Sequence, residues 1–476
     1  MVWYFRWMLM GLLLCAEGVF AQGFPVAHGQ GEMAGEVMQT SVILHSRLTN
    51  GIRLVNGDLP GAVGVACFEL SESTTFKDVF RTPWVSAIEA NDYLIKAKVT
   101  GLRPGTQYYY RLVFGPDMTR VLLGNTCRFR TLPGNQVRKA VRFVVVTGMN
   151  YDGFHNGPRA YQGKDRRHGY PALDAIFKLA PDFFVGTGDN VYYDDPRQGA
   201  AKTRAEMRKK WHQQFNQRRF IHLFARFPTY WMKNDHDYRY DDADTTGTRL
   251  PTHRDGIEVF KEQVPVVYPL DEDRVTYRTH RMGKLLQIWL MEGRDYRSPN
   301  RVEDDPGKTI WGAEQMAWLK QTLKASDTTF KILISSTPMV GSDDFRKKDN
   351  HTNIDGFQLE RDAFFEWLKA EGFLDKHFYL VCGDRHWQYH SAHPLGFEEF
   401  SSGALVDADA RRGREPGDPK STDPEAKVKV MYTYPEPTGG FLMVSVTPLK
   451  GSGAALEFVF LDETGKVLYR VKKEAE

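Results

Sequence analysis

The sequence predicts an all-β sandwich followed by a larger α/β domain. Between residues 40 and 132, short alternating runs such as GAVGVACFEL and TQYYYRLVF are separated by turn residues, a pattern typical of an antiparallel sandwich. From residue 141 onward, buried-type strands alternate with helical stretches, which indicates α/β layers. A chain of 476 residues exceeds one ordinary core, so two domains are expected.

The N-terminus has the features of a secretory signal. Arg6 precedes a short apolar run at 8–16 (MLMGLLLCA), and Val19-Phe20-Ala21 offers a small-residue cleavage site. The apolar run is too short for a membrane span. We therefore expect a cleaved signal peptide at 1–21, a mature chain without a transmembrane span, and a secreted or periplasmic location. The alternative is an uncleaved anchor.

The predicted sandwich covers residues 40–133, after a leader segment at 22–39 and before a linker at 134–140. Pro133-Gly134-Asn135 ends its last strand, because proline and glycine interrupt regular structure. Cys67 and Cys127 both fall in this domain. They could form a disulfide in an oxidising compartment, or remain two buried thiols.

The α/β domain is predicted to cover residues 141–476. Its buried-type strands are VRFVVVTG, DFFVGTG, LLQIWLM, FKILISST and FYLVCG. Helical spacing of apolar residues is present at 171–179, 203–224, 312–324 and 358–369. The aromatic residues on these helices are expected in the core: Trp211, Trp318, Phe365 and Trp367. After Gly439, three alternating runs predict three final strands.

The charge balance excludes several classes of partner. Lysine and arginine number 63 against 60 aspartates and glutamates, for a net charge of +3. A chain with so small a net charge has no strong overall electrostatic field that would favour binding to nucleic acid or to an anionic membrane. We expect a small-molecule substrate and a monomeric chain.

Three apolar runs each end in a cluster of polar residues. These are 182–195 (DFFVGTGDNVYYDD), 229–242 (TYWMKNDHDYRYDD) and 378–387 (FYLVCGDRHW). In open α/β sheets, ligands bind at the carboxyl ends of the strands, where the loops converge. Carboxylates and imidazoles delivered to one edge are typical of a site for multivalent cations.

Within the first two clusters, particular residues suit metal binding or proton transfer. Asp189 can bridge two cations through its two oxygens, and Tyr192 is close enough in sequence to join it. Asp235 or Asn234 can ligate through oxygen, and His236 suits proton donation to a leaving group. The structural alternatives are a buried Asp that caps a turn and a loop held by local side-chain turns.

The third cluster and a fourth strand end add further candidates. Asp384 and His386 stand at alternate positions of an extended turn, so each can reach a different cation. Arg294 and Arg297 follow the strand LLQIWLM and could bind a phosphoryl group through guanidinium donors. A surface salt-bridge pair is the alternative for these arginines.

Together these motifs resemble the PhoD-like alkaline phosphatases, which belong to the calcineurin-like and purple-acid-phosphatase-like metallophosphoesterases. The motifs, in order, are HGQGEMAGEVMQTSVILHSRLT, GDNVYYD, NDHD, EGRDYR, DGFQLER and GDRHW. The stretch VTGLRPGTQYYYRL resembles fibronectin type III-like domains. The resemblance implies that the second domain is a layered αββα metallophosphoesterase fold.

The resemblance also implies roles for individual residues. Asp189 matches the bridging aspartate and Tyr192 the metal-binding tyrosine. Asp235 matches the ligand that precedes the catalytic histidine, and His236 matches that histidine. Asp384 and His386 match the last pair of ligands. Arg294 matches the arginine in the family's Asp-Thr-Arg segment. It implies two metal ions, commonly iron, calcium, zinc, manganese or magnesium, and hydrolysis of phosphomono- or phosphodiesters with His236 protonating the leaving oxygen.

The chain departs from the family pattern at three points. Where the family offers a Cys or Asp after the first strand, this chain has Gly148-Met149-Asn150, so Asn150 is the candidate ligand there. Glu292-Gly293-Arg294 replaces an Asp-Thr-Arg segment, and Asn234-Asp235 replaces a double aspartate. These changes leave an alternative open, in which the chain is a non-catalytic metal-binding relative that acts as a surface binding module.

The polar stretch 407–429 is predicted to be a loop. It contains Arg411, Arg412 and Arg414. It could hold an anionic substrate as a lid over the site, or it could be a solvated surface loop.

Overall fold

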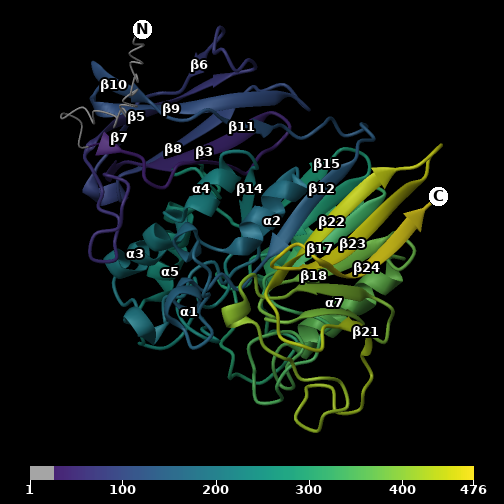
Figure 1. Cartoon of the computed structure of the whole chain (residues 1–476). Helices are drawn as coiled ribbons and strands as arrows, with labels where there is room; N and C mark the ends of the chain where they lie inside the picture. The colour runs from purple at the N-terminus through teal and green to yellow at the C-terminus, as the bar shows by residue number, and fades with distance from the viewer. Residues whose placement is uncertain (1–25) are drawn as a thin grey trace, which may run out of the picture.

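The computed structural model describes residues 26–476, so the predicted signal peptide lies outside the described residues. The chain forms a small sandwich and a four-layered α/β/β/α body, which confirms the predicted fold class (Figure 1). Two large sheets lie face to face and share one apolar core that includes Phe143, Val185, Ile288 and Phe458. The linker at 134–140 and the start of the second domain at residue 141 remain proposals from the sequence.

The nine-stranded sheet joins the sandwich to the α/β body. Its order is β24-β23-β22-β12-β13-β14-β2-β3-β8. The strands are β2 (Glu32–Gly35), β3 (Ser41–Arg47), β8 (Leu94–Thr100), β12 (Val141–Val146), β13 (Phe183–Gly186), β14 (Thr229–Trp231), β22 (Gly440–Pro448), β23 (Ala454–Asp462) and β24 (Val467–Ala475). The predicted leader at 22–39 needs correction, because β2 lies in it and pairs with β3 and, through Gly35, with Thr229 of β14.

A six-stranded sheet covers β2, β3 and β8 and completes the sandwich. It contains β5 (Gly64–Ser71), β6 (Phe80–Arg81), β7 (Val85–Ala87), β9 (Gln107–Asp117), β10 (Arg120–Leu123) and β11 (Cys127–Arg130), and the short pair β1 (Val26–Ala27) and β4 (Thr49–Asn50) lies beside it. Cys67 and Cys127 are buried free thiols. Of the two alternatives for these cysteines, the structure therefore has the one without a disulfide.

The seven-stranded sheet forms the other half of the α/β body. Its order is β15-β16-β17-β18-β20-β19-β21. The strands are β15 (Arg278–Met282), β16 (Leu286–Leu290), β17 (Phe330–Ser335), β18 (Phe378–Cys382), β19 (Gln388–Ala392), β20 (Glu398–Ser402) and β21 (Lys429–Thr433). β16, β17 and β18 run parallel, so their carboxyl ends open at the same edge.

Helices cover the outer faces of both large sheets. On the nine-stranded sheet lie α2 (Pro171–Leu179), α3 (Arg204–Phe215), α4 (Arg218–Phe224) and α5 (His253–Gln263), and on the seven-stranded sheet lie α6 (Gly312–Ala325) and α7 (Gln358–Ala370). The helix predicted at 203–224 is in fact two helices. Asn216 ends α3, and its side-chain amide donates to the carbonyls of Gly29 and Ile52. Contacts with the N-terminal segment therefore hold the chain at the point where it turns.

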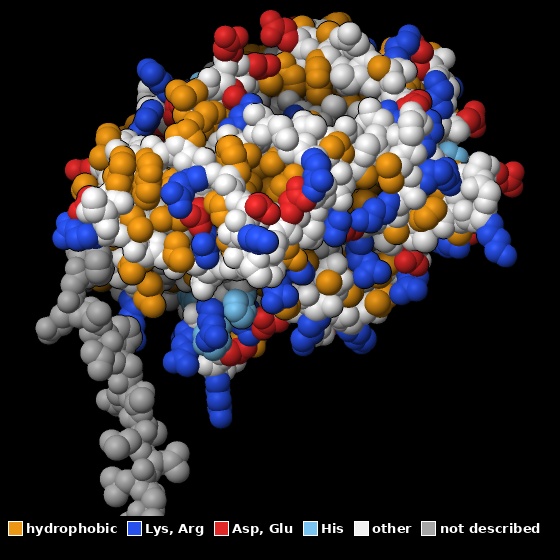
Figure 2. All heavy atoms as spheres, turned by 90° about the horizontal axis from the view of Figure 1, so that it is seen from above, with side chains coloured by type: hydrophobic (Ala, Val, Ile, Leu, Met, Phe, Trp, Pro, Cys, Tyr) orange, Lys and Arg blue, Asp and Glu red, His pale blue; other side chains and the backbone are white. Residues whose placement is uncertain are grey.

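The sandwich is fixed to the α/β body by buried polar contacts. His212 of α3 lies between two carboxylates of the sandwich side, with Nδ1 2.7 Å from Asp58 and Nε2 2.8 Å from Asp92. Arg278 pairs with Glu36. On the outer surface, basic and acidic side chains are interspersed on the face seen from above (Figure 2), in keeping with the small net charge. Among residues 26–476, no helix is long and apolar enough to cross a membrane.

Candidate metal centre

The three predicted strand-end clusters meet at one edge of the two large sheets. β13 and β14 are neighbours in the nine-stranded sheet, and β18 belongs to the seven-stranded sheet. Two contacts join the sheets: His386 Nε2 lies 3.2 Å from Asp189 Oδ2, and Asn234 Nδ2 donates to Asp384 Oδ1 at 2.9 Å. The three clusters therefore lie close together, as the sequence predicts.

The backbone at two candidate ligands is in the left-handed region. Asp189 has φ +54° and Asp384 has φ +64°, each directly after a strand. Residues with a Cβ rarely adopt this region, which costs on the order of 1 kcal/mol or more and is common at functional sites. Gly188 precedes Asp189 with φ +110°, and a Cβ there would lie 2.5 Å from the backbone nitrogen of Asn234. A glycine is therefore required where β13 and β14 end side by side.

One half of the site is formed by Asp189, Tyr192, His386 and Asp409. The Tyr192 hydroxyl lies 3.3 Å from His386 Nε2 and donates to Asp409 Oδ2 at 2.6 Å. His386 Nδ1 lies 3.0 Å from the carbonyl of Asp409. A proton on Nδ1 satisfies this contact and leaves the lone pair of Nε2 facing Asp189, the tautomer that a metal ligand needs.

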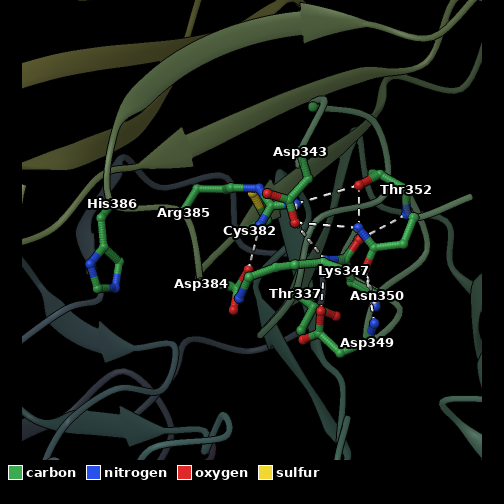
Figure 3. Close-up of polar contacts among 12 residues, drawn as sticks. Thr337, Asp343, Lys347, Asp349, Asn350, Thr352, Cys382, Asp384, Arg385 and His386 are labelled. Atoms are coloured by element: carbon green, nitrogen blue, oxygen red, sulfur yellow. Dashed lines mark hydrogen bonds and ion pairs between the residues drawn. The ribbon is translucent and has the colours of Figure 1, made fainter. Parts of the chain in front are cut away.

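The other half is formed by Asp235, Asp349 and Asp384. One carboxylate oxygen from each lies within 4.8 Å of the other two, and all three residues are buried. Asp349 was missed from the sequence because it stands in a charged run, DDFRKKD, far from any strand end. Figure 3 shows Asp384, Lys347 and Asp349 in one cluster, with the Arg385 side chain above Asp384 and joined to it by a dashed line. Arg385 donates to Asp384 Oδ2 at 2.6 Å and lies 3.0 Å from Asp343.

The donor set fits hard cations, because three buried carboxylate oxygens have no hydrogen-bond partner. These atoms are Asp189 Oδ1, Asp235 Oδ1 and Asp349 Oδ2. Burial raises the pKa of Asp189 to about 6, with the charge of Asp235 adding to the effect and His386 opposing it. Arg294 Nη2 lies 3.9 Å from Asp235 Oδ1 and 3.7 Å from Asp349 Oδ2, so one guanidinium faces both carboxylates without a hydrogen bond to either. Several buried carboxylates with so little compensation are costly, and a bound cation removes that cost. The site therefore has the chemistry of a metal centre.

His236 lies beside this centre as a proton donor would. Its Nδ1 is 2.8 Å from Asp194 Oδ1, and its ring stacks on Tyr192 with centroids 4.3 Å apart. Burial lowers the pKa of His236, but the charge of Asp235 and the hydrogen bond to Asp194 outweigh burial, so the pKa is raised well above the ordinary value. Asp194 was not singled out in the sequence, where it is one of several acidic loop residues.

Arg294 is placed differently from the phosphoryl-binding role expected of it. Its side chain is fully buried. Its Nη2 and Nε donate to Asn234 Oδ1 at 2.5 and 3.2 Å, and Nη1 donates to the carbonyl of Ala243. Asn234 in turn holds Asp384. Because its donors face protein groups, we propose that Arg294 positions Asn234 instead of touching a substrate.

Asn150 is likewise engaged in a structural contact. It is the N-cap of α1 (Tyr151–Asn156), and its Oδ1 accepts from the Gly153 nitrogen at 2.7 Å. Its Nδ2 lies 3.5 Å from Asp409 Oδ1. The oxygen that would ligate a cation therefore satisfies a helix terminus, and its amide faces a carboxylate from another segment.

A hollow of about 630 Å³ opens beside the centre. Five of its lining residues are basic and three are aspartates: Arg346, Lys347, Arg411, Arg412 and Arg414 against Asp242, Asp343 and Asp344. The Asp242 nitrogen donates to Asp235 Oδ2 at 2.6 Å, and the Arg411 nitrogen donates to the His386 carbonyl at 3.0 Å. The arginines of the predicted loop 407–429 thus line a hollow that begins at the candidate metal ligands.

Comparisons with known proteins agree with this geometry. The profile of PhoD-like phosphatase matches residues 143–427, and that of the PhoD-like phosphatase N-terminal domain matches residues 21–133. Alkaline phosphatase D of Bacillus subtilis (strain 168) is 22% identical over 487 aligned positions, which cover 92% of this chain and 79% of that relative.

Two solved structures share the fold over most of the chain. A structure of PhoD superposes with a TM-score of 0.71 at 17% identity, covering 95% of this chain and 90% of that one. Purple acid phosphatase PPD1 from yellow lupin (Lupinus luteus) seeds gives a TM-score of 0.61 at 12% identity, covering 93% and 73%. The chain therefore belongs to the PhoD-like phosphatase family and is a hydrolase of phosphoric esters.

Proposed function

We propose that the chain is a secreted, metal-dependent phosphoesterase that hydrolyses phosphomono- or phosphodiesters at a dinuclear centre. The observation that carries the proposal is the set of buried carboxylate oxygens without a hydrogen-bond partner at Asp189, Asp235 and Asp349, the last two of which lie 3.9 and 3.7 Å from one arginine, Arg294. They point to cations as the missing partners, since buried acceptors in proteins are otherwise satisfied.

Two groups of residues would hold the cations. Asp189, Tyr192 and His386 would hold the first, and Asp235, Asp349 and Asp384 the second, with Asp189 between them. Bound there, the cations would polarise the phosphoryl oxygens and activate a water molecule for attack on phosphorus. Asn234 and Arg385 hold Asp384 from behind, so its oxygens keep a defined direction.

The protein's own groups would bind the ester and move a proton. Lys347, Arg411 and Arg412 give the hollow beside the centre its positive lining, which favours an anionic substrate. His236, kept protonated by Asp194 and Asp235, would deliver its proton to the departing ester oxygen. Asp194 also lines a pocket of about 340 Å³ whose other walls are Ala200, Ala201 and Leu250 on one hand and Lys202, Arg239 and Arg249 on the other. We place the leaving group on that side.

The secreted location is proposed from the signal-like sequence at 1–21 alone. The direct test is the N-terminal sequence of the chain recovered from the extracytoplasmic fraction. A mature N-terminus at Gln22 supports the proposal, and a full-length chain retained inside the cell contradicts it.

The phosphoesterase proposal is tested by metal content and turnover on one sample. We expect two metal ions per chain by inductively coupled plasma mass spectrometry, with chelator-sensitive hydrolysis of p-nitrophenyl phosphate or bis-p-nitrophenyl phosphate. Asp189→Asn should lose both properties, whereas Asp362→Asn, whose side chain is half exposed, should retain them. No bound metal and no turnover after Fe, Ca, Zn, Mn or Mg is added would favour the non-catalytic binding module.

A further inference from the structure

The first proposed cation site has no thiol or carboxylate at the end of β12, where the family resemblance implies a ligand. β12 ends in Gly148-Met149-Asn150, which carries neither a thiol nor a carboxylate. Asn150 caps α1 through its only side-chain oxygen. Asp189, Tyr192 and His386 therefore remain as the donors from strand ends, and they leave this half of the site open on the β12 side.

A carboxylate from a distant segment lies on that open side. Asp409 ends the short 3-10 helix η4 (Asp407–Asp409). Its Oδ2 accepts from the Tyr192 hydroxyl at 2.6 Å and lies 3.5 Å from His386 Nδ1, while its Oδ1 lies 3.5 Å from Asn150 Nδ2. Its carboxylate thus contacts the Tyr192 hydroxyl, the Nδ1 side of the His386 ring and the side-chain amide of Asn150.

The charge of Asp409 is not neutralised by protein. Its side chain is 18% exposed, and within residues 26–476 it makes no ion pair with a lysine or arginine. Nearby, Asp189 is 1% exposed and its Oδ1 has no hydrogen-bond partner. Two carboxylates beside a phenol and an imidazole, with no basic side chain between them, are an arrangement that a cation stabilises.

The backbone holds Asp409 in place at the end of β12. The Leu405 nitrogen donates to the Thr147 carbonyl at 2.8 Å, and Thr147 and Ala404 form a parallel bridge. A Cβ on Gly148 would lie 2.9 Å from the Ala404 Cβ, so only glycine lets the segment approach this closely. The Arg411 nitrogen, bonded to the His386 carbonyl, anchors the other side. The segment 404–411 is therefore docked where a ligand from β12 would otherwise stand.

We propose that Asp409 completes the first cation site, supplying from the segment 404–411 the anionic ligand that the end of β12 does not. This inference rests on the proposed metal centre. It also sets the class of cation, because a site of carboxylates, phenol and imidazole without thiolate favours a hard cation over a thiophilic one. Tyr192 then ligates in place of its hydrogen bond to Asp409.

The test is the metal content of Asp409→Asn in the full chain, with Asp407→Asn as the matched control. Asp407 belongs to the same 3-10 helix, and within residues 26–476 its carboxylate has one hydrogen bond, from the Gly439 nitrogen at 3.4 Å. We expect Asp409→Asn to lose one of two metal ions per chain on dialysis, or to bind Mn²⁺ more than roughly 100-fold more weakly in calorimetry, and Asp407→Asn to match the wild type. Removing a direct ligand should exceed the roughly 10- to 100-fold effect of outer-shell changes, so a loss within that range would overturn the inference.

A charge-exchange variant separates ligation from folding. In Asn150→Asp/Asp409→Asn, the carboxylate moves across the 3.5 Å contact, and Asp can still cap α1. We expect the exchange variant to regain the second metal ion. Wild-type metal content in Asp409→Asn would overturn this inference and leave the proposed function standing. Loss of metal that the exchange variant does not restore would also overturn it, and a wild-type chain without metal would overturn both proposals.

Discussion

The buried charge of Asp189 should change stability in opposite directions in the metal-free and the metal-loaded chain. Asp189 is 1% exposed, and one of its oxygens has no partner. Replacing it with Asn removes the buried charge but also removes a ligand. Without metal, we therefore expect Asp189→Asn to be more stable than the wild type at high pH. With metal, we expect the order to reverse.

The size of the effect follows from the pKa. Burial, aided by the charge of Asp235, raises the pKa of Asp189 from 3.8 to about 6. A carboxyl group with a raised folded-state pKa stabilises the fold below its unfolded pKa, and this contribution is lost as pH rises through the folded pKa. Two units at 1.36 kcal/mol each give roughly 3 kcal/mol, lost between about pH 4 and pH 6. Asparagine does not ionise, so the variant keeps that stability at pH 8.

The assay is urea unfolding, followed by tryptophan fluorescence after chelation and dialysis. At pH 8 the metal-free variant should be more stable than the wild type by about 3 kcal/mol, and at pH 4 the two should agree within about 0.5 kcal/mol. Asp362→Asn controls for the loss of one surface charge. A metal-free Asp189→Asn that is no more stable than the wild type at pH 8 would refute the reasoning.

Three further predictions concern other parts of the molecule. His236→Ala should lower kcat about 100-fold or more, with a larger loss for phenyl phosphate than for p-nitrophenyl phosphate, whose leaving group needs less protonation; equal losses would argue against proton donation. Arg411→Gln/Arg412→Gln should raise KM on the order of tenfold at low salt with kcat unchanged, and Arg411→Lys/Arg412→Lys should restore most of the wild-type KM. An unchanged KM would show that the hollow does not contribute to substrate binding. His212→Ala should lower the free energy of unfolding in urea by about 3 kcal/mol, because it leaves Asp58 and Asp92 without their shared partner. A change below about 1 kcal/mol would show that the His212 contacts with these carboxylates contribute little to stability.

The strand ends at β13, β14 and β18 could be predicted because their signal is local. Each is an uninterrupted apolar run followed at once by polar residues, and such a run forms a strand whose end reaches the edge of a sheet. Asp189, Asp384 and His386 are candidates by that rule, whereas the choice of Asp235 over Asn234 was implied by the family resemblance. The αββα layering of the body was implied by the family resemblance and is confirmed.

Other features depended on contacts between distant segments. Asp349 and Asp409 stand in polar loops whose composition resembles any solvated loop, and only docking against Arg294 and Tyr192 brings them to the site. The positioning role that we propose for Arg294 has the same origin, since complete burial against Asn234 cannot be read from the motif EGRDYR.

The sequence by itself determined which strands end in candidate ligands, because alternation and apolar runs act over a few neighbouring residues. Tertiary structure alone decided which carboxylates converge, and it joined β2 to β14 across nearly two hundred residues. Such pairings depend on shape and charge complementarity between surfaces that are complete only in the folded chain, so no local pattern encodes them.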